Sequence, residues 1–215
     1  ALEYAWTKGK VLHRNLRPES IIIAKGGQPL LADFGMAKFA GAGGDELTMA
    51  GYTIGNPDYM SPEQVRGESG LDCRSDIYCL GLVLYECLAG RQPFKSASPV
   101  ALMEMQMSQP HQPLTQVSDA IDPACSSVID RMLEKAKARR HQDYPSLIAD
   151  FNAVLGGGVP SAMAGAASSK SAPELAPAAK KPLAPPAKAT KKPKSGKAAT
   201  FIAIAAAIAV IIALA

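Results

Sequence analysis

Apolar residues recur at helical spacing in several stretches of the chain. The longest is residues 76–90, DIYCLGLVLYECLAG, which is apolar on nearly every side. A helix of this kind must be buried on every side, so the segment is predicted to be a central helix, with Asp76 able to cap its start and Gly90 its end. The same spacing predicts three further helices, over residues 99–108, 123–135 and 146–155.

The beginning of the chain predicts a helix end and a β-hairpin. The first apolar cluster stops at a Lys-Gly-Lys sequence, which is typical of the end of a helix. Residues 21–24 (IIIA) and 29–32 (PLLA) lie on either side of Lys-Gly-Gly-Gln, which predicts antiparallel strands joined by a glycine turn. Such a hairpin sets a rigid separation between the loop 13–20 and the acid at position 33, which both need if they are to reach one ligand.

Composition changes near residue 155. Residues 1–155 carry 15 Lys and Arg against 18 Asp and Glu, whereas residues 156–197 carry 8 Lys against one acid, Glu174. The second segment is rich in Ala, Pro, Ser and Lys and cannot bury enough apolar surface to offset the entropy of ordering, so it is predicted to be a disordered linker. A basic tail can also bind nucleic acid, but this one has no aromatic side chain for base stacking, and no nucleic-acid partner is expected.

The chain ends in an uncharged apolar run, residues 198–215. Its length is close to the roughly 20 residues that span a bilayer, so it is predicted to be a truncated transmembrane helix. The lysines that precede it place the globular part on the cytoplasmic side by the positive-inside rule. The expected organisation is a single-pass membrane protein with a folded domain over 1–155, a linker over 156–197 and a span over 198–215.

The cysteines are widely spaced along the folded part. Cys73, Cys79, Cys87 and Cys125 form no C-x-x-C pair and have no neighbouring His. We therefore expect reduced, buried thiols in a cytoplasmic domain and no cysteine metal site. Residues 36–54 contain the run AGAGGD, which is too rich in glycine for a helix or a strand and predicts a mobile loop.

The residues with the clearest chemical pattern flank the hairpin. Residues 13–21 are HRNLRPESI and residues 33–35 are DFG. At matching spacing, they resemble the catalytic loop H-R-D-L-x-x-x-x-N and the metal-binding D-F-G loop of protein kinases. Residues 55–63, GNPDYMSPE, resemble the family's G-T-x-x-Y-M-[AS]-P-E sequence, which closes the activation segment.

Later parts of the chain extend this resemblance. Residues 76–90 are similar to the central helix of the kinase C-terminal lobe, and Arg140 stands where the family places an Arg that pairs with the Glu of A-P-E, here Glu63. Residues 1–155 thus resemble the C-terminal lobe of a bacterial-type, membrane-anchored Ser/Thr protein kinase. The resemblance implies an α+β fold, mostly α in this chain, with a short β-hairpin.

The resemblance also implies roles for charged residues near the hairpin. Asp33 is implied as the main Mg²⁺ ligand at an ATP site, and Arg17 as the cation that contacts the transferring phosphate. Arg14 is implied to bind a phosphorylated residue of the following loop, where Thr48 and Thr53 are the candidates for autophosphorylation.

Other implied roles are structural. Asp76 is implied to hold the backbone of the 13–20 loop; a plain helix cap is the alternative, and both can be true. The residues that the resemblance implies to be structural are His13, Asn56, Glu63, Asp76 and Arg140.

Three residues depart from the family pattern around the proton-transfer centre. Asn15 stands where the family has the catalytic Asp, and an amide cannot take the proton of a substrate hydroxyl. Ser20 replaces the second metal ligand, an Asn, and keeps a single oxygen, so only weak metal binding is expected there. Asn56 replaces a Thr that in the family bridges the base and the phosphate-contacting Lys.

Two functions are compatible with these residues. The departures favour a pseudokinase that acts in membrane-linked signalling by binding and scaffolding another protein. The alternative is an active Ser/Thr kinase that transfers the ATP γ-phosphate to a protein substrate and to its own Thr48 or Thr53. Both ends of the sequence look cut, and it contains no Gly-rich loop or strand Lys of an ATP site, so this chain alone is expected to be inactive.

Overall fold

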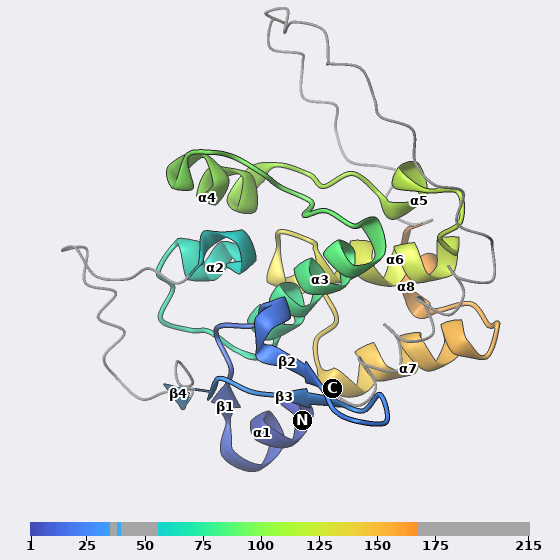
Figure 1. Cartoon of the computed structure of the whole chain (residues 1–215), viewed down its shortest axis with the longest axis horizontal. Coiled ribbons are helices and arrows are strands. Elements are labelled where there is room, and N and C mark those ends of the chain that lie inside the picture. The colour runs from blue at the N-terminus through green and yellow to red at the C-terminus, as the bar shows by residue number, and fades with distance from the viewer. Residues whose placement is uncertain (35–37, 40–55, 167–215) are drawn as a thin grey trace, which may run out of the picture.

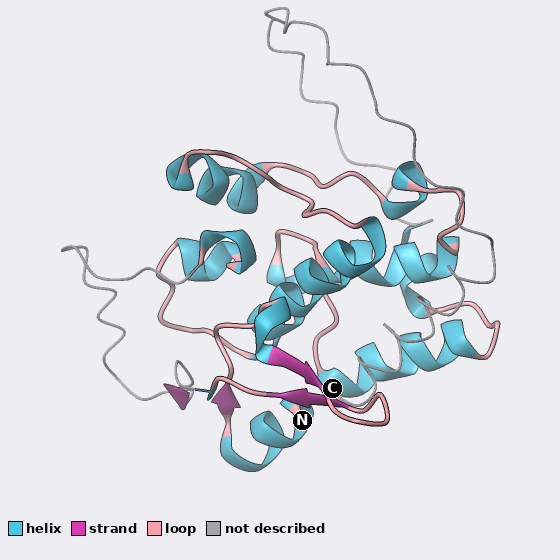
Figure 2. Ribbon diagram, viewed as in Figure 1, coloured by secondary structure: helices cyan, strands magenta, loops and turns pink. Residues whose placement is uncertain are grey.

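The computed structural model describes residues 1–34, 38–39 and 56–166. Helices make up most of this part of the chain, and Figure 2 shows the short strands gathered near its N-terminal end. Helix α3 (Cys73–Ala89) runs through the middle of the molecule with the other helices around it (Figure 1). The expectation of an α+β fold, mostly α, with a short hairpin is confirmed.

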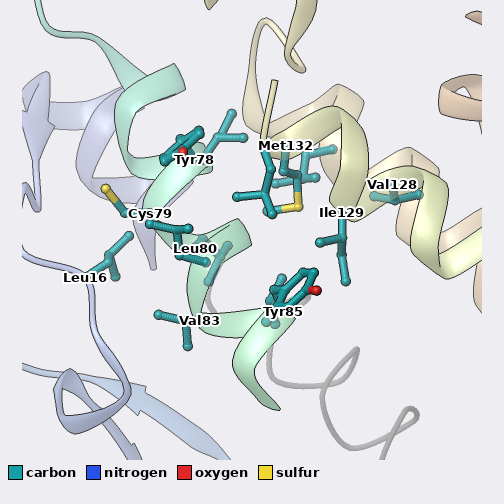
Figure 3. Close-up of a cluster of buried hydrophobic side chains, with 14 of the residues drawn as sticks. Leu16, Tyr78, Cys79, Leu80, Val83, Tyr85, Val128, Ile129 and Met132 are labelled. Atoms are coloured by element: carbon teal, nitrogen blue, oxygen red, sulfur yellow. The ribbon is translucent and has the colours of Figure 1, made fainter. Parts of the chain in front are cut away.

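Helix α3 is central because its side chains are buried on every side. All residues from Ser75 to Tyr85 are buried, and Figure 3 shows several of them packed with apolar side chains of another helix. Gly90 ends the helix with a left-handed φ of 68°, as predicted. The prediction that Asp76 caps the start is wrong, because the helix begins about one turn earlier and its N-cap is Asp72.

The other predicted helices are present with small changes in their bounds. They are α4 (Pro99–Ser108), α6 (Pro123–Met132) and α7 (Tyr144–Leu155), each with Pro in its first turn. The short helices α2 (Pro62–Val65) and α5 (Leu114–Val117) are additional to those predicted.

Helices α3 and α6 approach closely at Gly81. A Cβ at this position would lie 3.0 Å from the Cβ of Met132 and 3.1 Å from Cδ2 of Leu133. The glycine therefore permits the packing of Val128, Ile129 and Met132 against the central helix (Figure 3).

The strands form two antiparallel pairs. β2 (Ile21–Ile23) pairs with β3 (Pro29–Leu31), with Ile22 opposite Leu30, and the turn between them uses Gly26 and Gly27 at φ 110° and 83°. The predicted hairpin is confirmed. The helix α1 (Leu2–Gly9) leads into β1 (Val11–Leu12), which pairs with β4 (Lys38–Phe39).

Two elements lie where none was expected. Strand β4 falls inside the predicted loop 36–54, and the other residues of that loop lie outside the described part of the chain. Helix α8 (Ser161–Ala166) falls inside the predicted disordered linker 156–197, so the order of residues 156–166 differs from that expectation. The physical reason is the carboxylate of Asp150 in α7, which accepts the N–H groups of Ser161 and Ala162.

The predicted membrane span, residues 198–215, lies outside the described residues. Among residues 1–34, 38–39 and 56–166, no helix has both the length and the apolar character to cross a bilayer.

The cysteines are free thiols. Cys73, Cys79 and Cys125 are buried, as expected, but Cys87 is exposed near the end of α3, contrary to the expectation for it. Burial raises the pKa of the Cys73 thiol to about 11, so this group is protonated at neutral pH.

Candidate functional site

The backbone of the 13–20 loop is fixed by Asp76. The N–H groups of His13 and Arg14 donate to the two carboxylate oxygens of Asp76 at 2.8 and 2.9 Å. Burial raises the pKa of this carboxyl, while the two N–H bonds favour its charged form. The interpretation of Asp76 as the holder of the loop backbone is therefore supported by direct contacts.

His13 joins this loop to the residues after β3. Its Nε2 lies 2.8 Å from the carbonyl oxygen of Ala32, and its Nδ1 accepts the N–H of Asn15 at 3.3 Å. Because Nδ1 is an acceptor, the proton lies on Nε2, which donates to the carbonyl. The His13 ring also contacts Phe34, with 4.6 Å between the ring centroids.

Two residues on either side of the hairpin adopt unusual backbone conformations. Arg14 has φ 64° and Asp33 has φ 63°, in the left-handed region that non-glycine residues rarely occupy. Such conformations persist where surrounding contacts determine them, and they gather at functional sites. Here Asp76 accepts the N–H of Arg14, and the His13 ring binds the carbonyl of Ala32, next to Asp33.

The hairpin brings position 20 next to the acid at position 33. The N–H of Ala32 donates to the carbonyl of Ser20 at 2.8 Å, so Asp33 follows directly after this bond. Asp33 is exposed at the end of β3. A carboxylate is a hard oxygen ligand that suits Mg²⁺, so Asp33 fits the role that the resemblance implies.

Ser20 fits a metal-ligand role poorly. Its side chain is buried, and its hydroxyl donates to the carbonyl of Arg17 at 2.7 Å and accepts the N–H of Arg17 at 3.1 Å. The hydroxyl thus uses its proton and a lone pair to close the turn Pro18–Ser20. Its role in the structure is to stabilise the loop.

Arg17 keeps a partly exposed cation beside this turn. Its Nε lies 3.9 Å from Oε2 of Glu19, and the Arg17 side chain is 36% exposed. A contact of this length is weak, and Nε is buried without a hydrogen-bond partner, so the guanidinium is available to an anionic ligand.

Asn56 has a local structural role. Its side-chain oxygen accepts the N–H of Asp58 at 3.2 Å and caps the turn Pro57–Tyr59. The same turn is held by Tyr59, whose hydroxyl donates to Glu86 at 2.5 Å. Burial, followed by the bond to Glu86, raises the pKa of Tyr59.

The predicted pair of Glu63 and Arg140 is present and fully buried. Nη1 and Nη2 of Arg140 donate to the two carboxylate oxygens of Glu63 at 2.6 and 2.9 Å, and both side chains are 0% exposed. Arg140 also donates to the carbonyls of Arg74, Glu134 and Lys135. Burial alone would raise the pKa of Glu63, but the bonds from Arg140 outweigh it and hold that pKa below its usual range.

Two glutamines complete the site and are not among the predicted residues. Gln64 donates to the carbonyl of Arg14 at 2.8 Å and accepts the N–H of Ser61, so it joins α2 to the 13–20 loop. The Ser-x-x-Gln spacing of a capping box is visible in the sequence, but it does not reveal the contact with Arg14. Gln106 of α4 donates to the carbonyl of Asp58 at 3.1 Å, and no sequence pattern indicates this.

Thr48 and Thr53 lie outside the described residues, so the structure does not place them relative to Arg14. Within the described ranges, no three His, Cys, Asp or Glu side chains gather into a metal site. Of the predicted metal-binding residues, Asp33 has the suitable chemistry and exposure.

The geometry combines a fixed 13–20 loop, an acid after the hairpin and a buried Glu–Arg pair. A model of the protein kinase domain matches residues 1–147, and the chain belongs to this family.

Curated relatives include serine/threonine-protein kinases of bacteria. PknB of Mycolicibacterium smegmatis is 35% identical over 162 residues, which is 75% of this chain and 26% of that protein. Pkn3 of Myxococcus xanthus is 40% identical over 152 residues, 67% of this chain and 28% of that protein. A probable serine/threonine-protein kinase of Streptomyces coelicolor is 34% identical over 157 residues, 73% of this chain and 23% of that protein. The chain therefore spans about a quarter of the length of these relatives.

Proposed function

We propose that this member of the protein kinase family is a pseudokinase, which acts in signalling by binding and scaffolding another protein. The observation that supports this most directly is a well-held 13–20 loop that carries an amide at position 15, where the family has a carboxylate. Asp76 holds the backbone just before Asn15 and the His13 ring accepts the N–H of Asn15, yet the side chain at position 15 is an amide. An amide can orient a hydroxyl but cannot accept its proton.

The metal chemistry is reduced in the same way. The relatives are named serine/threonine-protein kinases, and the family uses ATP with Mg²⁺. In this chain, Asp33 can hold one cation and Arg17 can contact phosphate, whereas the Ser20 hydroxyl is bonded to Arg17 within its own turn. ATP binding with one metal ion, without efficient transfer, is the behaviour that these residues support.

A membrane anchor forms part of the proposal. The uncharged run 198–215 and the lysines before it support an anchor with the kinase-like lobe on the cytoplasmic side of a membrane. Fractionation of the full-length protein tests this point, because clean recovery in the soluble fraction without detergent contradicts it.

The main experiment measures transfer of labelled phosphate from ATP to protein. The full-length protein is compared with Asn15→Asp and with the double variant Asn15→Asp/Ser20→Asn. A general base contributes about 10²- to 10⁴-fold in rate, so the variants should gain activity over the natural protein by up to that factor. The variant Glu19→Gln, next to the loop turn, serves as a control that adds no base.

The alternative is an active kinase, favoured by the retained Asp33 and Arg17. Equal transfer by the natural protein and Asn15→Asp, at a rate well above that of Asp33→Asn, would establish it. Modified Thr48 or Thr53 in the natural protein, but not in Asp33→Asn, would support autophosphorylation.

A further inference from the structure

A buried carboxylate of α7 binds the segment that follows the kinase-like lobe. Asp150 is 4% exposed. Its Oδ1 accepts the N–H of Ser161 at 2.6 Å, and its Oδ2 accepts the N–H of Ala162 at 3.2 Å and the hydroxyl of Ser161 at 3.0 Å. The matched kinase domain ends at residue 147, so this acceptor and its ligands lie beyond it.

The other side of the carboxylate is held by the lobe. Nε2 of His141 lies 2.9 Å from Oδ2 of Asp150, and Nη1 of Arg131 lies 3.4 Å from the same atom. The same guanidinium nitrogen donates to the hydroxyl of Ser161 at 2.9 Å. Arg131 of α6 and Asp150 of α7 therefore both bind Ser161, and His141 of the loop before α7 holds the Asp150 carboxylate.

The electrostatics favour a charged Asp150. Burial alone would raise its pKa, but the bonds from His141 and Ser161 outweigh this and hold the pKa below its usual range. Hydrogen bonds to a charged acceptor are about twice as strong as neutral ones. The carboxylate is thus a firm acceptor at neutral pH.

Apolar contacts make a limited contribution to this docking. Pro160 and Ala162 are buried, whereas Val159 and Met163 are 75% and 39% exposed. Both buried side chains are small, so the apolar area they remove from water is modest, and the polar bonds to Asp150 add the larger directional contribution to docking.

We propose that Asp150, His141 and Arg131 form a latch for the chain's own segment 160–162. With the latch closed, residues 156–166 stay against the lobe. With the latch open, these residues lengthen the tether between the lobe and the membrane anchor, which is itself part of the proposed function. At about 3.3 Å per extended residue, this segment adds roughly 35 Å of reach. The latch therefore sets how far the lobe can move from whatever holds the rest of the chain.

The bend between the two helices allows this docking. The N–H of Gly158 returns to the carbonyl of Ala153 at 2.8 Å, and Gly157 adopts φ 70°. A left-handed glycine turns the chain back at little steric cost, which brings Ser161 beside Asp150.

Hydrogen–deuterium exchange of the intact chain at neutral pH tests the latch. The readout is the exchange rate of the Ser161 and Ala162 amides, which donate to Asp150. Ser161→Ala removes the two hydroxyl contacts and leaves the lobe intact, so these amides should exchange roughly 10- to 100-fold faster, which corresponds to hydrogen bonds with charged partners. Ser146→Ala is the matched control, because its exposed hydroxyl bonds only to Asp143.

Comparing a charged with a neutral substitution at position 161 tests whether the Asp150 carboxylate holds the segment. Ser161→Asp places a second negative charge beside Asp150 and should speed exchange more than the neutral Ser161→Asn. Exchange of Ala162 in the natural chain as fast as in an unstructured peptide would overturn the proposal. So would equal rates in the natural chain, Ser161→Ala and Ser161→Asp.

Discussion

Replacement of Arg140 by Met should be among the most damaging single changes in this lobe. The substitution keeps much of the side-chain volume but leaves the Glu63 carboxylate buried, since both residues are 0% exposed. It also leaves the carbonyls of Arg74, Glu134 and Lys135 without their guanidinium donor. Removal of one partner from a buried ion pair costs about 3–5 kcal/mol in free energy of unfolding.

The loss should depend on pH in a defined direction. In the natural chain, the lowered pKa of Glu63 stabilises the fold above the ordinary carboxyl pKa, and this contribution is lost as the pH falls through the folded-state pKa. In Arg140→Met, burial without a cation raises the Glu63 pKa, so the variant gains stability relative to neutral pH as the carboxyl becomes protonated. The difference between the two proteins should therefore shrink from pH 7 towards about pH 4.

Urea unfolding followed by far-UV circular dichroism, at several pH values, measures this difference. Arg139→Met is the control, because Arg139 is the exposed neighbour of Arg140 and should change stability by less than about 0.5 kcal/mol. Adding Glu63→Gln to Arg140→Met removes the stranded charge and should recover about 1–3 kcal/mol. A loss below 1 kcal/mol in Arg140→Met, or a loss that does not vary with pH, would refute this reasoning.

Three other changes give simpler tests. Asp76→Asn replaces one acceptor oxygen with an NH₂ group that faces a backbone N–H, so it should cost about 2 kcal/mol in the same assay and speed amide exchange at His13 and Arg14. Gly81→Ala should destabilise by about 1–3 kcal/mol, because its Cβ would crowd α6; a neutral effect would contradict the close approach. Burial, and then Arg140, lower the pKa of Lys135 to about 7, so the unfolded chain binds more protons above that pH. Unfolding free energy should therefore rise between about pH 7 and pH 10 in the natural chain, and less so in Lys135→Met.

The fold was predictable in segments where a single feature, such as burial on all sides or a glycine turn, determines the local structure. Residues 76–90 are apolar on all sides and form the buried helix, and the Gly-Gly turn between two apolar runs forms the hairpin. The helix start differs because Asp72 and Asp76 are both acids at suitable spacing for a cap, and the sequence does not show which of them has distant backbone partners. Helix α8 was not predictable from composition, because its order depends on Asp150, a single residue in another helix.

The sequence indicated which residues belong to the site, but it did not indicate all the hydrogen bonds that connect them. The resemblance to the kinase family implies the pairing of Glu63 with Arg140 and of Asp76 with the 13–20 loop, and the structure has both contacts. Gln64 and Gln106 donate from neutral side-chain amides to the backbone carbonyls of Arg14 and Asp58, which are distant in sequence. Such contacts depend on how the helices pack against one another, and the apolar periodicity of the sequence does not determine that packing.

The difference between retained and changed motif residues has a physical explanation in the energetics of the lobe. Asp76, Glu63 and Arg140 are buried charges, and loss of any partner leaves an unpaired charge or unsatisfied N–H groups in the core, at a cost of several kcal/mol. Their presence is therefore required for folding whether or not the protein transfers phosphate. Asn15 is only partly buried, so an amide in place of a carboxylate at this position costs the fold little, although an amide cannot take a proton. For this reason, the buried contacts around Asn15 are evidence for the family, whereas phosphate transfer depends on groups that folding does not require.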